Sequence, residues 1–103
     1  MEISKIQQLC KAGSIRWTLH VMTRLVQRNI STSDVEYAIM NGEIIEQYED
    51  DAPYPSCLIF GTVVAGQPLH VVCGIAPDEL WLITAYYPSK EEWKPDFKHR
   101  KRR

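Results

Sequence analysis

Residues 56–87, SCLIFGTVVAGQPLHVVCGIAPDELWLITAYY, decide the fold. Three stretches rich in β-forming residues are separated by two short turns that contain Gly, Pro or acidic residues. These stretches predict strands over residues 56–64, 69–75 and 80–87. Short connections between consecutive strands are typical of an antiparallel meander. A further strand is expected over residues 43–48, and the prolines of the loop 50–55 separate it from the meander.

The chain before residue 43 has helical periodicity. Apolar residues recur at intervals of three and four, which predicts helices over residues 2–12, 16–28 and 32–41. Ser31 and Asp34 have the spacing of a capping box at the start of the third helix, and Asn41-Gly42 is a stop signal at its end. Helices followed by antiparallel strands indicate an α+β domain, with two or three N-terminal helices packed on a four-stranded antiparallel sheet.

Length and composition fit a single domain. The chain has 103 residues, of which 45% are hydrophobic and 24% are charged. We expect one domain over residues 1–97 and a basic tail over 98–103. The sequence has neither an apolar run of membrane-spanning length nor the pattern of a signal peptide, so no membrane partner is expected. The three cysteines lack CxxC spacing, which predicts reduced core residues in a cytoplasmic protein.

The net charge of −1 hides an uneven distribution of charge. Five of the 12 Lys and Arg residues lie within the last six positions, so the rest of the chain carries 7 basic and 13 acidic residues. Such a tail is often a solvated end, but it also offers non-specific attraction to a polyanion. Arg100 is therefore a candidate RNA-binding residue.

Four side chains at intervals of four residues predict a row along one side of the second helix: Arg16, His20, Arg24 and Arg28. Guanidinium groups suit phosphate because their planar fork can bind two oxygens. The opposite side of the helix is expected to face the core through Ile15, Leu19, Met22, Leu25 and Val26. The alternative for the arginines is that they pair with the acidic residues between 43 and 51.

A second polar group is expected on the sheet. If Ala76 pairs with Leu80 across a three-residue turn, His70 lies opposite Tyr86. Thr84 then falls on the same face, which gives three polar side chains in one group. The other face of this strand is more apolar and is expected to pack against the helices.

Together these groups suit metal-independent cleavage of RNA. One histidine takes the proton of a 2′-hydroxyl and another protonates the leaving oxygen, while arginines stabilise the charge that develops on phosphorus. The candidate catalytic residues are His20, Arg24, His70, Thr84 and Tyr86, and the candidate phosphate-binding residues are Arg16, Arg28 and Arg100. Taken singly, each histidine is better explained by an ordinary surface or hydrogen-bonded role, and only the pair favours catalysis. No metal site or other cofactor is expected, because the histidines and cysteines lack ligand spacing.

Several short motifs, in order, resemble those of a widespread bacterial family. The first stretches are His20-x-x-x-Arg24-x-x-x-Arg28-x-Ile30, Asp34-Val35 and Gly42-Glu43-Ile44-Ile45-Glu46-x-Tyr48. The sheet and its end add Pro53-x-Pro55, Leu58-Ile59-x-Gly61, Pro68-Leu69-His70-Val71-Val72, Thr84-x-Tyr86-x-Pro88 and Trp93. Over residues 17–97 the chain is similar to the domain-of-unknown-function family four-two-five-eight.

The resemblance implies a fold and an activity. The family is grouped by fold with RelE-like, barnase, EndoU and colicin ribonucleases, many of which are toxins. The resemblance therefore implies that this chain is an endoribonuclease with RNA as its substrate and a cognate antitoxin protein as its partner. Carried over by position, the active groups are those of the helix and the sheet face already named.

Two other functions stay open. A non-catalytic binding or regulatory module would use the same cleft for a peptide, a nucleotide or a protein, and the acidic body of the chain favours it. A structural subunit would form a homodimer through aromatic side chains that we expect to be exposed, namely Tyr54, Trp81, Tyr87 and Trp93.

Overall fold

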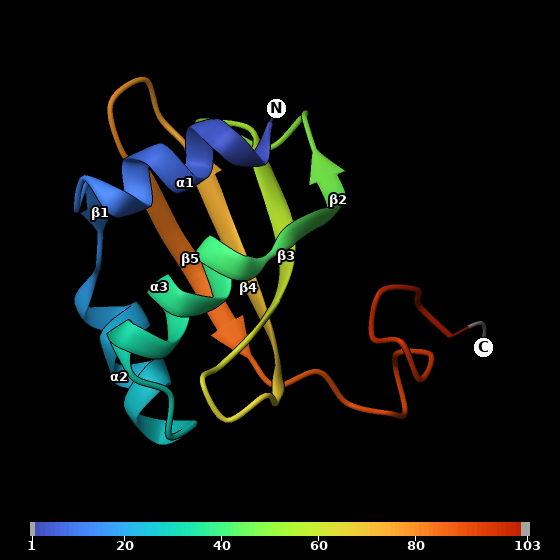
Figure 1. The fold of residues 1–103 in the computed structure, drawn as a ribbon. Helices are drawn as coiled ribbons and strands as arrows, with labels where there is room; N and C mark the ends of the chain where they lie inside the picture. The colour runs from blue at the N-terminus through green and yellow to red at the C-terminus, as the bar shows by residue number, and fades with distance from the viewer. Residues whose placement is uncertain (1, 102–103) are drawn as a thin grey trace.

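The computed structural model describes residues 2–101 as an α+β domain with three helices and a five-stranded mixed sheet (Figure 1). The helices are α1 (Ile3–Lys11), α2 (Leu19–Gln27) and α3 (Thr32–Asn41). The strands are β1 (Ile15–Arg16), β2 (Glu43–Tyr48), β3 (Ser56–Thr62), β4 (Pro68–Ile75) and β5 (Leu80–Tyr86), in the spatial order β1-β5-β4-β3-β2.

The predicted helices are present, and side-chain caps mark the starts of α2 and α3. The Ser31 hydroxyl accepts a hydrogen bond from the backbone N–H of Asp34, whose carboxylate accepts one from the N–H of Ser31, so the expected capping box is confirmed. At α2 the Thr18 hydroxyl accepts from the N–H of Val21 at 3.1 Å. This cap places the start of α2 at Leu19, three residues later than predicted.

The prediction of four antiparallel strands was wrong by one strand. Ile15 and Arg16 leave the predicted helix and pair in parallel with Leu80 and Trp81 at the outer side of β5. The N–H of Leu80 donates to the carbonyl of Ser14 at 2.8 Å, which extends this pairing. A strand of two residues has no alternation of its own, so the sequence pattern did not reveal it.

The predicted meander of β2 to β5 is confirmed, including its central register. His70 lies opposite Tyr86, and Val72 lies opposite Thr84. At the turn, however, Ile75 rather than the expected Ala76 pairs with Leu80. The register shifts between Val72 and Cys73, so a β-bulge in β5 adds one residue and compensates for the difference at the turn.

One face of the sheet packs on the helices and forms the core. Its buried side chains include Cys57, Ile59, Leu69 and Val71, together with Ile6, Leu25 and Ile39 from the three helices. Gly61 allows α3 to approach β3, because a Cβ atom at this position would lie 2.1 Å from the carbonyl oxygen of Ala38. All three cysteines are buried and form no disulfide.

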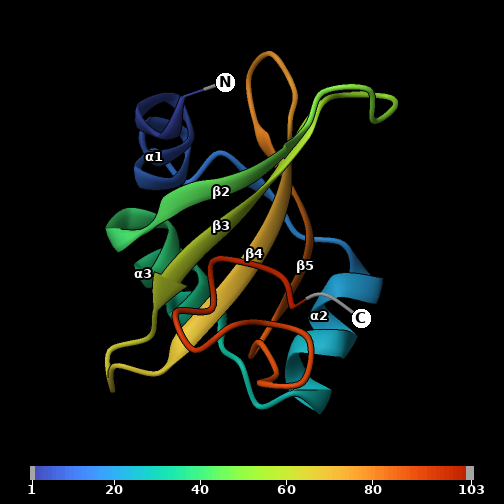
Figure 2. The ribbon, with the colours of Figure 1, turned by 90° about the vertical axis from the view of Figure 1, so that its right-hand side faces the viewer.

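The opposite side of the sheet, here called the second face, carries the C-terminal segment, residues 88–101. Figure 1 shows the helices and this segment on opposite sides of the sheet, and Figure 2 shows the segment crossing in front of the strands. The described part of the predicted basic tail thus lies against the domain, whereas Arg102 and Arg103 are outside the described residues. None of the helices within residues 2–101 is long and apolar enough to cross a membrane.

The core-facing side of α2 differs from the prediction. Leu19 and Val26 are 83% and 76% exposed, whereas Val21 and Leu25 are buried. Among the aromatic residues expected to be exposed, Trp93 is in fact buried, with 1% of its surface accessible. A homodimer surface that includes Trp93 therefore requires the C-terminal segment to move.

Candidate functional site

The predicted row of basic side chains is only partly formed. Arg16 belongs to β1, so the row on α2 consists of His20, Arg24 and Arg28. Each step of four residues also advances about 40° around a helix, so the row turns as it ascends. Since Val21 and Leu25 mark the buried side, Arg28 lies closest to the sheet and His20 points furthest away from it.

Arg28 joins α2 to β5. One terminal nitrogen of its guanidinium, Nη1, donates to the Thr84 hydroxyl at 2.9 Å and to the Ala85 carbonyl at 2.9 Å. These bonds fix the guanidinium beside Thr84 on the second face and leave its other N–H groups to solvent or a ligand. The structure thus brings together two of the predicted site residues that are 56 positions apart in the sequence.

His20 and Arg24 are exposed, and within residues 2–101 neither has a hydrogen-bond or ion-pair partner. The acidic residues of β2 pair with the C-terminal segment instead: Lys98 contacts Glu43, and Arg100 contacts Glu46. The alternative interpretation, in which the helix arginines pair with residues 43–51, is therefore wrong.

Arg16 has a structural environment of its own at the other end of β5. Its Nε lies 3.0 Å from a carboxylate oxygen of Glu79, and its guanidinium carbon is 5.0 Å from the centre of the Trp81 ring. The Trp81 indole also donates to Glu79 at 2.9 Å. Arg16 therefore stabilises the β1–β5 edge and is separate from the row on α2.

His70 is completely buried beneath the C-terminal segment. Its Nε2 lies 2.7 Å from the carbonyl oxygen of Phe97, and because a carbonyl only accepts, Nε2 carries the hydrogen. Nδ1 is then free to accept from the Tyr86 hydroxyl at 3.3 Å. Burial lowers the pKa of His70 and raises the pKa of Tyr86, so both side chains are held neutral.

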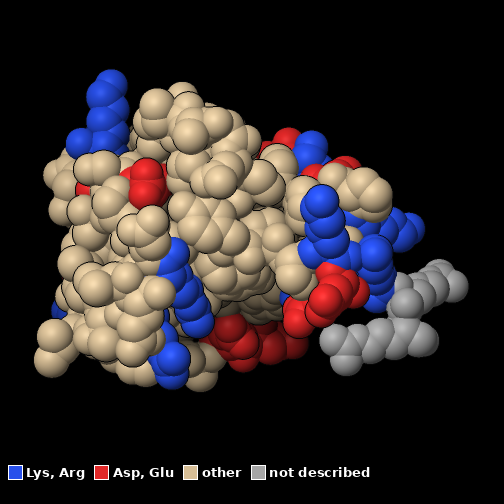
Figure 3. All heavy atoms as spheres, turned by 90° about the horizontal axis from the view of Figure 1, so that it is seen from below, with Lys and Arg blue, Asp and Glu red and all other residues tan. Residues whose placement is uncertain are grey.

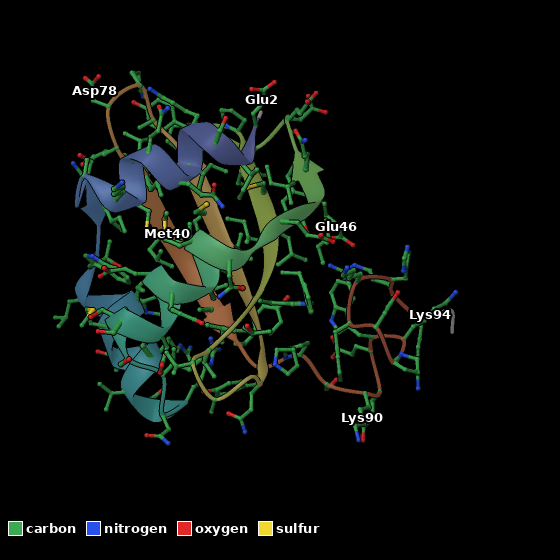
Figure 4. The ribbon with its side chains drawn as sticks, viewed as in Figure 1. Glu2, Met40, Glu46, Asp78, Lys90 and Lys94 are labelled. Carbon is green, nitrogen blue, oxygen red and sulfur yellow. The ribbon has the colours of Figure 1, made fainter. Side chains whose placement is uncertain are left out.

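Arg100 closes the segment over β2 through Glu46. Two guanidinium nitrogens donate to the two carboxylate oxygens at 2.9 and 3.1 Å, and the guanidinium carbon lies 4.7 Å from the centre of the Trp93 ring. The Arg100 hydrogen bond lowers the pKa of Glu46. Burial raises the pKa of Tyr48, which donates to the same carboxylate, to about 12. Figure 4 shows Glu46 on the side of β2 that faces the segment.

The predicted site residues therefore lie in three places. His20, Arg24, Arg28 and Thr84 lie along α2 and β5. His70 and Tyr86 lie under the C-terminal segment, to which Arg100 belongs, and Arg16 pairs with Glu79 at the β1–β5 edge. In the described chain no contact joins His20 to His70. Figure 3 shows Lys and Arg atoms at several places on this face, with Asp and Glu atoms between those at its lower centre and those at its right.

Three residues around His70 were missed as site residues: Glu46, Trp93 and Phe97. The alternation within residues 43–48 was a usable signal, since it places Glu46 and Tyr48 on one face. The C-terminal segment has no regular period, so its contacts with His70 had no local signal. Among the described residues, no cluster of three or more His, Cys, Asp or Glu is arranged to hold a metal ion.

The fold defines a small α+β domain, and α2 carries the exposed side chains of His20 and Arg24. The chain belongs to the family described as Domain of unknown function (DUF4258), which matches residues 17–87. This match spans α2 to β5 and stops just before the C-terminal segment. No curated protein and no solved structure gives a significant match.

Proposed function

We propose that this protein is a metal-independent endoribonuclease of the RelE/barnase-like type that binds single-stranded RNA along α2. One observation carries the proposal: His20 and Arg24 are exposed and, among residues 2–101, have no partner, and they lie beside an arginine that the sheet holds in place. Such a guanidinium can bind a phosphate without first breaking an internal ion pair.

The residues have distinct roles in this proposal. Arg24 and Arg28 bind the phosphate that is attacked, and Thr84 orients Arg28. His20 performs one of the two proton transfers: it takes the proton of the 2′-hydroxyl, or it protonates the 5′-oxygen that leaves when the oxygen–phosphorus bond breaks. The attacking 2′-oxygen forms the new bond to phosphorus as the bond to the 5′-oxygen breaks. Solvent supplies or accepts the proton that His20 does not transfer, so this first step consumes no water.

A cleavage assay tests the proposal directly. Purified protein is incubated in EDTA with a single-stranded RNA labelled at both ends, and with a DNA of the same sequence. We expect cleavage of the RNA alone, because DNA lacks the 2′-hydroxyl. His20→Ala is expected to lower the rate at least about 100-fold, in line with the loss of a general acid or base.

Two matched variants control for charge and for helix stability. Lys90→Ala removes an exposed positive charge on the outer side of the C-terminal segment (Figure 4) and is expected to leave cleavage unchanged. Gln27→Ala alters an exposed position of α2 outside the row and is expected to do the same. Cleavage that survives His20→Ala at the wild-type rate would refute the assignment.

A second candidate function is a binding module without catalysis. The burial of His70, with both ring nitrogens hydrogen-bonded, favours it, because that histidine has no access to a ligand while the C-terminal segment is in place. This function predicts binding of the labelled RNA, or of a cognate antitoxin protein, to the face of α2 with no cleavage at high protein concentration.

A further inference from the structure

The second face of the sheet carries a row of three rings. Phe60, His70 and Tyr86 lie directly opposite one another on β3, β4 and β5. The ring centres are 6.1 Å apart between Phe60 and His70, and 5.3 Å apart between His70 and Tyr86. Thr84, which holds Arg28, lies two residues before Tyr86 on the same strand. The row of rings therefore continues from the phosphate-binding residues of the proposed site.

The C-terminal segment covers this row without becoming part of the sheet. Within the described residues, the hydrogen bonds that join its backbone to other backbone groups are internal, such as Trp93 N–H to the Ser89 carbonyl at 3.1 Å and Lys101 N–H to the Glu92 carbonyl at 2.9 Å. Its only β-bridge in that range joins Trp93 to Arg100. The segment is thus a self-contained loop that can leave without breaking a strand ladder.

Four kinds of contact attach the segment to the second face, and one of them is the ammonium of Lys98 over the Phe60 ring, 5.4 Å from the ring centre. The indole of Trp93 packs edge-on against His70, with ring centres 4.5 Å apart, and the Phe97 carbonyl accepts from His70. Two ion pairs add to this attachment, Arg100 with Glu46 and Lys98 with Glu43. The side chains of both pairs are partly exposed to water, and such pairs contribute little to stability.

We infer that the C-terminal segment is an exchangeable cover over a base-binding site for single-stranded RNA, a conclusion that rests on the proposed function. The covered positions already hold the chemical groups of a nucleobase. The Trp93 indole is a planar ring against His70, and the Phe97 carbonyl takes the hydrogen bond that a carbonyl oxygen of a base would accept. Phe, Tyr and His side chains on a sheet commonly stack with unpaired bases.

This arrangement makes the segment a competitor of RNA. When a protein must open before it binds, its apparent affinity falls in proportion to the fraction of molecules that are open. Displacement of the segment would also expose His70 to the RNA, beside Tyr86 and Thr84. His70 on the sheet would then be a second titratable group for the bound RNA, in addition to His20 on α2.

A charge-swap series tests the inference on the full chain. Arg100→Glu and Glu46→Arg each break the ion pair that holds the segment, whereas the double variant restores it with the charges exchanged. Binding is measured by the fluorescence anisotropy of a labelled single-stranded RNA, and opening by hydrogen exchange of the amides in residues 88–101. Arg100→Glu is the decisive variant, because it removes a positive charge that would attract RNA. Tighter binding of RNA by this variant therefore reports the opening of the segment and not a gain in electrostatic attraction.

We expect Arg100→Glu to increase exchange in the segment and to tighten RNA binding by about fivefold, the upper end of what one partly exposed ion pair contributes. The double variant is expected to return both properties to the wild-type values. In the Arg100→Glu background, Phe60→Leu is expected to weaken binding by about fivefold or more, because a base loses its stacking partner. In the closed wild type, the same substitution is expected to have little effect.

Other results separate the two proposals. If Arg100→Glu opens the segment but weakens RNA binding, RNA uses the segment as a basic surface and the inference is overturned, while the proposed function stands. If no variant binds RNA at all although the segment opens, both the proposed function and the inference fail.

Discussion

The buried His70 predicts a pH dependence of stability with a definite sign. Its folded-state pKa is lowered, chiefly by burial, below the ordinary value of 6.5. Above about pH 6.5 the ring is neutral in both folded and unfolded chains, so it adds no pH dependence. Below that pH the unfolded chain takes up a proton that the buried ring does not bind, and the free energy of unfolding falls.

The magnitude follows from the single proton involved. The free energy of unfolding is expected to fall by up to about 1.4 kcal/mol per pH unit below pH 6.5, until the folded-state pKa is reached. Glu46 also has a shifted pKa, but it acts at lower pH. Its pKa is lowered from the ordinary value of 4.5, so its contribution to the free energy of unfolding is lost only below about pH 4.5. The range between these two values therefore separates the effect of His70 from that of Glu46.

Urea unfolding followed by circular dichroism, between about pH 7.5 and 5.5, measures the effect. His70→Gln is the matched control, because glutamine retains an N–H that can donate to the Phe97 carbonyl but does not titrate. The wild type is expected to lose stability toward acid more steeply than the variant. Equal slopes in the two proteins would refute the idea that the neutral ring is held by burial.

Three further predictions concern the free energy of unfolding, which thermal or urea unfolding measures. Gly61→Ala is expected to lower the free energy of unfolding by more than about 3 kcal/mol, because the new Cβ atom would clash with the backbone of α3. Gly74→Ala is the control: a Cβ atom there would have no contact closer than 3.7 Å, and the expected loss is about 1 kcal/mol or less. Leu25→Ala is expected to cost about 2–5 kcal/mol, and Leu19→Ala, at an exposed position, about 0.5 kcal/mol or less; similar costs would contradict the observed orientation of α2. Arg28→Ala is expected to cost about 1–2 kcal/mol through its two lost hydrogen bonds, and no change would show that they are replaced by water.

Much of the sheet was predictable because the strands β2 to β5 each have a local signal. The alternation along β4 and the turn before β5 led to the pairing of His70 with Tyr86, which the structure has. The agreement depends on two differences that cancel: the turn is one residue different from the prediction, and the bulge in β5 restores the register. Bulges have no clear pattern in a single sequence, so this part of the agreement is a coincidence.

The orientation of α2 was not predictable from the same kind of signal. The helix carries apolar side chains on more than one side. Because Ile15 was counted as helical, the expected core side was shifted toward Leu19 and Val26. The choice between two apolar sides depends on which one meets the sheet. That contact is tertiary, so the pattern of this helix alone does not identify the side that is buried.

The candidate site shows a similar division between local and tertiary information. The spacing of His20, Arg24 and Arg28 was visible because a helix repeats it. The cover over His70 was not visible, because residues 88–101 have no period and meet the sheet only through tertiary contacts. Long-range pairs such as Arg100 with Glu46, 54 positions apart, have no signature in a single sequence.

The contact of Arg28 with β5 has a consequence for association between molecules. β5 is paired with β1 only at Leu80 and Trp81, so the rest of its outer side ends the sheet. An open edge of this kind is a template on which a strand of another chain can add, and natural proteins obstruct such edges with charged side chains. The guanidinium of Arg28 donates a hydrogen bond to the carbonyl of Ala85. A positive charge therefore lies where the backbone of an incoming strand would have to form its hydrogen bonds. The residue that anchors the proposed phosphate site thus also protects the sheet against aggregation.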